Sequence, residues 1–321
     1  MPIVKHLIFV ATLLSFSVSA QQPSTIFKSL ENFGDNPGEL TASYFSDNET
    51  NPNLVVLLHG CTQNGEQLAQ QSGMLGLARQ RGFALLLPQQ SSNNNIQNCF
   101  NWFSSQDQQR DVGESLSLKN MITTLTSRTK AQRVYIAGIS AGGAMASAML
   151  VNYPDIFTAG AVIAGLPYPC ANNLTKAISC MRTGPSQTAQ QLANIVNHYP
   201  HIAESIDAKK SWPRLSVWTS STDKVVNPRN GQHLAQQWAH LSEIAAVPVV
   251  SQRQNYQLSQ WRNASEQVVI ELIEIEGVGH GMAVNSELAN GGVEAPFLLK
   301  STVSTAVSIV DFWGLGERNG S

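Results

Sequence analysis

Short apolar runs that alternate with helical patterns constrain this 321-residue chain more than any other feature. The runs at residues 54–58, 134–137 and 161–164 contain no charged or amide side chain and have the length of buried strands. A strand that is apolar on both faces must be covered on both sides, as strands of a parallel sheet are. The alternation therefore predicts an α/β fold with a mostly parallel central sheet and helices on both faces.

The remaining elements follow from the same two periodicities. Further strands are predicted at 83–87, where Pro88 is expected to end the strand, and at 215–218 and 268–275. Apolar residues at helical spacing predict helices at 68–78, 118–125, 141–152, 233–241 and 303–310.

Two segments lack these patterns. Residues 89–111 are rich in Gln, Asn and Ser and are predicted as a long polar loop. Residues 166–211 show no strand pattern, hold two cysteines and are predicted as a small insertion. No linker, repeat or change of composition follows residue 20, so residues 21–321 are predicted to form a single domain.

The charge balance excludes two classes of protein. Lys and Arg number 20 against 22 Asp and Glu, which gives neither the basic excess of a nucleic-acid binder nor a polybasic membrane surface. At 42% hydrophobic residues the chain is too apolar to be disordered. Its 25 Gln and 24 Asn outnumber all charged side chains, a tendency of exported proteins.

The first twenty residues are typical of a signal peptide. Lys5 supplies a positive charge, residues 7–14 are an apolar stretch too short to cross a bilayer, and residues 18–20 form a small-residue cleavage pattern. No later stretch approaches a membrane span. We therefore expect a secreted protein, extracellular or periplasmic, without a membrane anchor.

Four cysteines remain in the chain after residue 20: Cys61, Cys99, Cys170 and Cys180. An even number in an exported chain indicates disulfides, and four cysteines allow three pairings. The pairing Cys61–Cys99 with Cys170–Cys180 closes the shortest loops and is favoured, with a bond from Cys61 to Cys170 or Cys180 as the alternative. The cysteines lack the close pairs of a zinc site, so no metal is expected.

The motif with catalytic chemistry is Gly-Ile-Ser-Ala-Gly at residues 138–142. It follows a predicted strand and opens a predicted helix, as a nucleophile elbow does. The glycines permit a sharp turn, and the helix N-terminus stabilises developing negative charge. This context predicts Ser140 as a nucleophile.

A serine nucleophile needs a base and an acid that orients it. His280 lies in a glycine-rich loop after the last long predicted strand, where an α/β-hydrolase carries its base. Asp223 follows the strand at 215–218, and the order Ser140, Asp223, His280 fits the fold. The alternative for Asp223 is a turn-capping residue. In this fold, one oxyanion donor comes from the loop after the strand that corresponds to 54–58, and the other comes from the residue after the nucleophile. We therefore expect the backbone N–H groups of Cys61 and Ala141 to form the oxyanion hole.

Several motifs together resemble one known family, the poly(3-hydroxybutyrate) depolymerase and feruloyl esterase-type family of secreted α/β-hydrolase esterases. They span about residues 32–315 and occur at 36–38 (Asn-Pro-Gly), 59–63 (His-Gly-Cys-Thr-Gln), 99–103 (Cys-Phe-Asn-Trp-Phe), 138–143, 301–302 and 312–315 (Phe-Trp-Gly-Leu). The resemblance implies an α/β-hydrolase fold and cofactor-free hydrolysis of carboxylic esters. It carries the nucleophile, acid and base onto Ser140, Asp223 and His280, and the oxyanion cysteine onto Cys61.

The substrate is expected to be a poly- or oligo(3-hydroxyalkanoate). The alternative is a feruloyl or acetyl ester of a plant cell-wall polysaccharide, since the same triad serves both. Trp102 and His59 are predicted substrate-binding residues, Trp102 because a Cys61–Cys99 bond would bring it to the site and His59 because it lies beside the serine. Many family members add a binding module after the catalytic domain, and its absence after Leu315 favours soluble oligomers or amorphous polymer. A serine peptidase and an inactive binding module are the competing classes.

Overall fold

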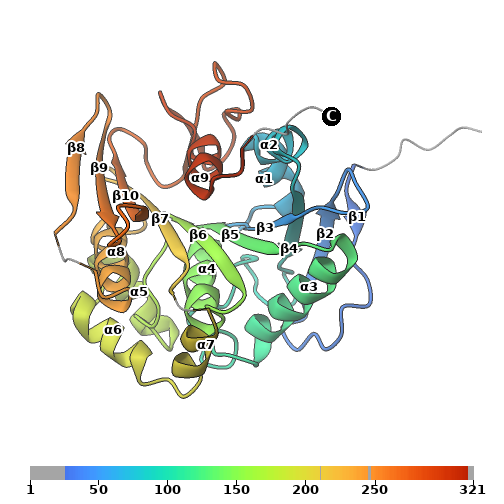
Figure 1. Cartoon of the computed structure of the whole chain (residues 1–321), viewed down its shortest axis with the longest axis horizontal. Helices are drawn as coiled ribbons and strands as arrows, with labels where there is room; N and C mark the ends of the chain where they lie inside the picture. Colours follow the sequence, from blue (N-terminus) through green and yellow to red (C-terminus); the bar gives the residue numbers. More distant parts are fainter. Residues whose placement is uncertain (1–25, 210, 245–246, 317–321) are drawn as a thin grey trace, which may run out of the picture.

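A central sheet of mostly parallel strands organises the protein in the computed structural model, which describes residues 26–209, 211–244 and 247–316. The predicted signal peptide lies outside these residues. Within them, ten strands form one sheet in the order β1-β2-β4-β3-β5-β6-β7-β10-β9-β8 (Figure 1). The strands from β4 to β10 in this order run parallel, and the outer ones pair antiparallel. Their bounds are β1 (Lys28–Ser29), β2 (Thr41–Phe45), β3 (Asn53–Leu58), β4 (Ala84–Gln89), β5 (Arg133–Ile139), β6 (Phe157–Ile163), β7 (Arg214–Ser220), β8 (Val249–Gln252), β9 (Tyr256–Arg262) and β10 (Val268–Ile275), with a separate pair β11 (Met282–Val284) and β12 (Leu298–Lys300).

Helices cover both faces of the sheet, as the apolar strands require. They are α1 (Gly65–Gln71), α2 (Met74–Arg81), α3 (Gly113–Thr129), α4 (Ala141–Asn152), α5 (Leu174–Thr183), α6 (Ala189–Asn197), α7 (Ile202–Lys209), α8 (Arg229–Leu241) and α9 (Thr305–Trp313). In Figure 1, α1, α2 and α9 lie on one face, and α3, α4 and α8 lie on the other. Alternate residues of β3 serve the two sides: Val56 and Leu58 join the core under α3, α4 and α8, whereas Val55 and Leu57 join the core under α1, α2 and α9.

Most predicted elements are present, with two differences at turns. The strand predicted to stop at Pro88 continues to Gln89. The pairing of β4 with β3 ends at Leu86, so at Pro88 the only neighbouring strand is β2. A proline is tolerated there because its missing N–H breaks no hydrogen bond to β3. The helix predicted at 68–78 is two helices, α1 and α2, since Gly73 between them takes a left-handed backbone with φ of 87°. A Cβ at Gly73 would also lie 2.0 Å from the Asn290 carbonyl oxygen.

The predicted insertion is a helical segment. It leaves β6 and returns to β7 through α5, α6 and α7, and α6 packs on α8. The pairing Cys170–Cys180 lies in this segment and Cys61–Cys99 in the loops beyond β3 and β4, in agreement with the shortest-loop prediction.

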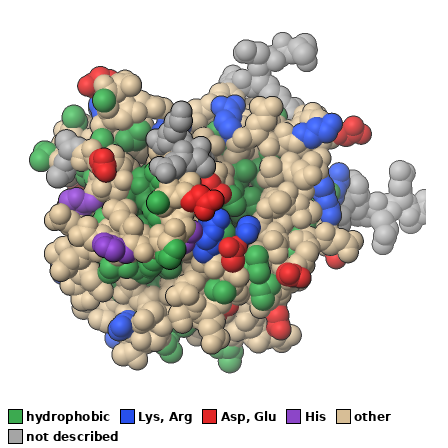
Figure 2. Space-filling model, turned by 60° about the horizontal axis from the view of Figure 1, so that its bottom comes forward, with side chains coloured by type: hydrophobic (Ala, Val, Ile, Leu, Met, Phe, Trp, Pro, Cys, Tyr) green, Lys and Arg blue, Asp and Glu red, His purple; other side chains and the backbone are tan. Residues whose placement is uncertain are grey.

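The surface reflects the amide-rich composition. Figure 2 shows one face on which most atoms belong to uncharged polar side chains or backbone and charged side chains are a minority. No helix in the described part of the chain has both the length and the apolar character needed to span a membrane.

Candidate active site

Ser140 stands at the turn between β5 and α4 with a strained backbone. Its φ of 57° and ψ of −119° lie outside the regions that non-glycine residues favour. Ser140 is the N-cap residue of α4. The flanking glycines make this turn possible. A Cβ at Gly142 would lie 2.4 Å from the carbonyl oxygens of Leu58 and His59, and one at Gly138 would lie 2.1 Å from the Gly142 oxygen. The turn thus has the geometry of a nucleophile elbow.

The three residues predicted as a triad lie in one hydrogen-bonded row. His280 Nε2 is 2.9 Å from Ser140 Oγ, and His280 Nδ1 is 2.7 Å from Asp223 Oδ2. The Asp223 side chain is 1% exposed and the His280 side chain 11% exposed. This arrangement can move a proton from the serine hydroxyl to the imidazole and stabilise the imidazolium that forms.

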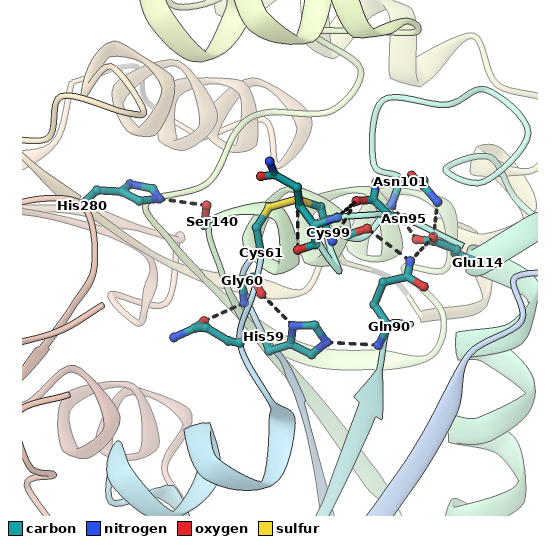
Figure 3. The surroundings of a disulfide bond; sticks show 12 residues. His59, Gly60, Cys61, Gln90, Asn95, Cys99, Asn101, Glu114, Ser140 and His280 are labelled. Atoms are coloured by element: carbon teal, nitrogen blue, oxygen red, sulfur yellow. Dashed lines mark hydrogen bonds between the residues drawn. A yellow bond between two sulfur atoms is a disulfide. The ribbon is translucent and has the colours of Figure 1, made fainter. Parts of the chain in front are cut away.

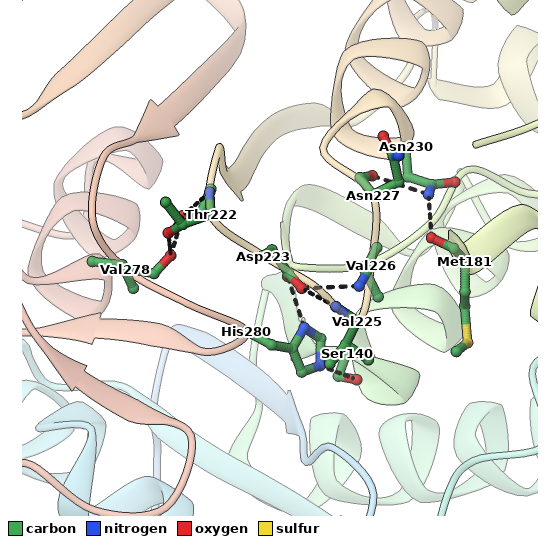
Figure 4. Close-up of polar contacts among 11 residues, drawn as sticks. Ser140, Met181, Thr222, Asp223, Val225, Val226, Asn227, Asn230, Val278 and His280 are labelled. Atoms are coloured by element: carbon green, nitrogen blue, oxygen red, sulfur yellow. Dashed lines mark hydrogen bonds and ion pairs between the residues drawn. The ribbon is translucent and has the colours of Figure 1, made fainter. Parts of the chain in front are cut away.

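Asp223 is held by its own loop after β7 (Figure 4). Its second oxygen, Oδ1, accepts the backbone N–H groups of Val225 at 2.8 Å and Val226 at 2.9 Å. The base loop is tied to the same turn, because the Val278 carbonyl accepts hydrogen bonds from Ser220 Oγ and from Thr222 Oγ1. Acid and base are therefore fixed relative to each other before any substrate binds.

The Asp223 loop also contacts the inserted helix α5. The Asn227 N–H donates to the Met181 carbonyl at 2.7 Å, and Asn230 Nδ2 donates to the Cys180 carbonyl at 2.9 Å. Asn230 is fully buried. The C-terminal turn of α5 and the acid loop consequently pack as one unit (Figure 4).

The loop after β3 passes directly beside the serine. A Cβ at Gly60 would lie 3.4 Å from Ser140 Cβ. Among the described residues, neither the Cys61 N–H nor the Ala141 N–H has a hydrogen-bond acceptor. Two links hold the loop to residues 97–99: the Cys61–Cys99 disulfide and a hydrogen bond of 2.7 Å from the Thr62 N–H to the Gln97 carbonyl. The expected oxyanion donors are thus free and close to Ser140.

His59 lies under this loop and not in the cavity. It is fully buried, its Nε2 accepts the Gln90 N–H at 3.1 Å, and its Nδ1 lies 2.7 Å from the Gly60 carbonyl oxygen (Figure 3). A carbonyl oxygen only accepts, so the proton is on Nδ1 and the ring is neutral. Burial lowers the pKa of His59, which favours the same neutral form. With both ring nitrogens bonded to backbone, the structure places His59 as a brace of the loop, away from any substrate.

A cavity of about 400 Å³ opens over Ser140. Trp102 lies in its wall, as predicted, in edge-to-face contact with Phe103. The sequence prediction missed α5 as a second wall, although its signal was present: Leu174, Ile178 and Met181 recur at helical spacing, and all three line the cavity. Among the lining residues that the structure describes there is no Lys, Arg, Asp or Glu.

Across residues 26–209, 211–244 and 247–316, no group of three or more His, Cys, Asp or Glu side chains is arranged to hold a metal ion.

Comparison with known proteins identifies the family. The family model for esterase PHB depolymerase matches residues 46–251, more than half of the chain. The chain is 32% identical to poly(3-hydroxyalkanoate) depolymerase C of Paucimonas lemoignei, over 97% of this chain and 75% of that protein. The chain belongs to the esterase PHB depolymerase family.

Two further similarities bear on this family assignment. The chain is 30% identical to feruloyl esterase B of Talaromyces stipitatus, over 78% of this chain and 71% of that protein. The solved acetyl xylan esterase of Aspergillus awamori superposes with a TM-score of 0.73 at 23% identity, over 90% of this chain and 99% of that chain. The fold is that of the α/β-hydrolases, and the protein is a carboxylic ester hydrolase of the PHB depolymerase type.

Proposed function

We propose that this family member is a secreted serine esterase that hydrolyses poly- or oligo(3-hydroxyalkanoates) through an acyl-enzyme on Ser140. The observation that carries the proposal is the row Ser140–His280–Asp223 at the base of an uncharged cavity. A hydroxyalkanoate is an aliphatic chain with neutral ester groups, so it gains from apolar walls and needs no charged partner. The name of the Paucimonas lemoignei relative supports the same substrate class.

The geometry supports the following chemical steps. Ser140 Oγ attacks the ester carbonyl carbon while His280 Nε2 takes the hydroxyl proton. The carbonyl oxygen becomes an oxyanion that accepts the N–H groups of Cys61 and Ala141. Collapse expels the alcohol, which receives the proton from His280, and leaves Ser140 acylated. Water then repeats the sequence, with His280 as base, and releases the acid and free Ser140.

One observation favours a second candidate. The Trp102–Phe103 pair presents aromatic surface to the cavity, and aromatic rings pack well against a phenolic acyl group. Feruloyl or acetyl esters of plant cell-wall polysaccharide are therefore the alternative substrates, as the feruloyl esterase relative also suggests. Kinetics with 3-hydroxybutyrate oligomers, amorphous polymer, methyl ferulate and acetylated xylan decide between them. A kcat/KM that is highest for methyl ferulate or acetylated xylan would reject the hydroxyalkanoate assignment.

Ser140→Ala tests the nucleophile. We expect kcat to fall by about 10⁴- to 10⁶-fold with the melting temperature unchanged. His280→Gln should inactivate the enzyme as well, whereas His233→Gln is the matched control because His233 is a half-buried residue of α8, outside the cavity lining, whose Nδ1 lies 2.9 Å from the Arg229 carbonyl oxygen of the same helix. If the Ser140→Ala protein kept more than about a tenth of the wild-type kcat, the triad would be wrongly assigned.

We also infer that residues 1–20 are removed during export and that residues 21–321 act as one catalytic domain. The sequence pattern and the two disulfides support export, since disulfides persist in oxidising compartments. N-terminal sequencing of the protein recovered outside the cytoplasm should begin at Gln21. A mature protein that still starts at Met1 would contradict the inference.

A further inference from the structure

A carboxyl group without a cationic partner is buried behind the loop after β3 at residues 60–63, which we call the oxyanion loop. Glu114, in the first turn of α3, is fully buried. Its Oε1 accepts hydrogen bonds from Gln90 Nε2 at 2.5 Å, Asn101 Nδ2 at 2.8 Å and Asn94 Nδ2 at 3.2 Å, and its Oε2 accepts the Asn101 N–H at 2.8 Å. In the described part of the chain, no Lys or Arg forms an ion pair with it.

Burial of this group is costly. Desolvation by burial raises the pKa of Glu114 to about 8, the hydrogen bonds from Asn101 and Gln90 act in the opposite direction, and the negative charge of Asp107 adds to the rise. A buried carboxyl is tolerated when its oxygens are fully hydrogen-bonded. Here two oxygens gather four donors from one irregular loop, which no other side chain of this size can do. Glu114 therefore organises residues 90–101.

Two hydrogen-bond routes lead from Glu114 to the oxyanion loop (Figure 3). In the first, Gln90 bonds Glu114 and the Cys99 carbonyl through its side chain, while its backbone N–H bonds His59 Nε2. In the second, Asn101 accepts Asn95 Nδ2 at 2.9 Å on its Oδ1.

The second route ends at the same place. Asn95 Oδ1 accepts the N–H groups of Gln97 at 3.0 Å and Cys99 at 3.3 Å. Gln97 and Cys99 are the residues that hold Thr62 and Cys61. Glu114 thus reaches the oxyanion loop both through His59 and through the disulfide.

Both routes act on one peptide group. The Gly60 carbonyl and the Cys61 N–H belong to the same planar trans peptide and point in opposite directions. His59 Nδ1 fixes the carbonyl, and the disulfide fixes the Cys61 side of the plane. The Gln63 N–H also donates to the Gly60 carbonyl, at 3.3 Å. Of the groups that set the direction of the Cys61 N–H, His59 and the disulfide are the ones that Glu114 holds in place.

We propose that Glu114 is a positioning residue that orients the Cys61 N–H of the oxyanion hole through Gln90–His59 and Asn101–Asn95–Cys99. The inference rests on the proposed function, in which that N–H stabilises the oxyanion. According to this inference, Glu114 affects the energy of the transition state although it is buried and remote from the cavity. Ground-state binding of the substrate does not depend on the oxyanion contact, so KM should not depend on Glu114.

Glu114→Gln tests the proposal. The variant keeps the size of the side chain but replaces one carboxylate oxygen with an NH₂ group, which then faces an N–H donor of the loop and cannot accept its hydrogen bond. With p-nitrophenyl butyrate we expect kcat to fall about 10- to 100-fold and KM to stay within about twofold, since small errors in orientation cost large factors in rate. Phosphonylation of Ser140 by a fluorophosphonate should slow by a similar factor, because its phosphoryl oxygen must enter the same hole. Glu204→Gln, an exposed first-turn carboxyl of α7, is the control and should leave both rates unchanged.

The outcomes separate the two ideas. If Glu114→Gln lowers only the melting temperature, with kcat within about twofold of the Glu204→Gln control, the residue is a packing group and the inference fails. If Ser140→Ala stays active, the proposed function fails independently of Glu114. Should Glu114→Gln not fold, Gln90→Met replaces it: the variant keeps the backbone N–H on His59 but removes the side-chain bonds of Gln90 to Glu114 and to the Cys99 carbonyl, so that only the route through Asn101 and Asn95 remains. Its kcat should fall by about fivefold or more with KM unchanged, and an unchanged kcat overturns the inference.

Discussion

The Cys61–Cys99 disulfide is expected to support catalysis as well as stability, and the second disulfide supplies the control. The double variant Cys61→Ser/Cys99→Ser keeps both backbone N–H groups but releases the loop beside Ser140. With a sequence separation of 38, chain entropy predicts a loss of about 4 kcal/mol in the free energy of unfolding. For Cys170→Ser/Cys180→Ser, with a separation of 10, the same relation predicts a loss of about 3 kcal/mol.

The two variants should differ in kinetics despite their similar stabilities. Loss of one oxyanion donor costs about 10²- to 10³-fold in kcat. Because the bond from Thr62 to Gln97 and the contact from His59 to Gly60 remain, we expect a smaller decrease, about tenfold, for Cys61→Ser/Cys99→Ser. The control should change KM more than kcat, since its disulfide anchors α5, a wall of the cavity.

The assay combines urea unfolding with steady-state hydrolysis of p-nitrophenyl butyrate, at a temperature where all three proteins are folded. An unchanged kcat in Cys61→Ser/Cys99→Ser would refute the coupling, as would an equal decrease of kcat in both double variants. Peptide mapping that joined Cys61 to any cysteine other than Cys99 would remove its basis.

Two further predictions concern the cavity wall and a buried carboxyl. Trp102→Ala should change the ratio of kcat/KM between methyl ferulate and a 3-hydroxybutyrate oligomer by about tenfold, because a whole aromatic wall is lost; an equal decrease for both substrates would contradict a role in specificity. Glu271, on β10, accepts Ser216 Oγ at 2.7 Å, and burial raises its pKa to about 7 from an ordinary 4.5. The folded chain then holds a proton that the unfolded chain releases, so this contribution to stability is complete below pH 4.5 and is lost as the pH rises through about 7, with a slope of about 1.4 kcal/mol per pH unit. Glu271→Gln should remove that slope in urea unfolding between pH 5 and 7, and an unaltered slope would show that another group titrates.

The parts of the fold that sequence predicts well are those with two-sided burial. The inner strands β3, β5 and β6 are apolar on both faces, so their runs are visible in the sequence. The outer strands β8 and β9 were not predicted. Most residues of β8 are exposed, and β9 alternates weakly among Gln and Ser, so neither shows an apolar face.

The candidate site divides in the same way. Ser140, Asp223 and His280 follow strand ends, so chain order and the strand pattern bring them together. His59 was predicted to contact substrate because it was expected to lie beside the serine, but it is fully buried and packs against Phe100 from the long polar loop, with 5.0 Å between the ring centroids. Such a contact between irregular segments leaves no periodic signal. The sequence does not indicate the role of Glu114 either, since acidic residues are common in the first turn of a helix because they stabilise the helix dipole.

The two proposed oxyanion donors differ in what holds them, and this difference accounts for the amide-rich composition of residues 89–111. The Ala141 N–H is a free donor of the first turn of α4, so the helix alone directs it. The Cys61 N–H comes from a loop and needs bracing by the disulfide, His59 and the side chains around Glu114. Bracing by Asp would place a negative charge next to the reacting carbonyl, where it would repel the developing oxyanion. Gln and Asn supply donors and acceptors without charge, and Glu114, the carboxyl group that holds them, is fully buried behind the loop among four N–H donors. The amide-rich loop is therefore the form of support that a preorganised backbone N–H requires.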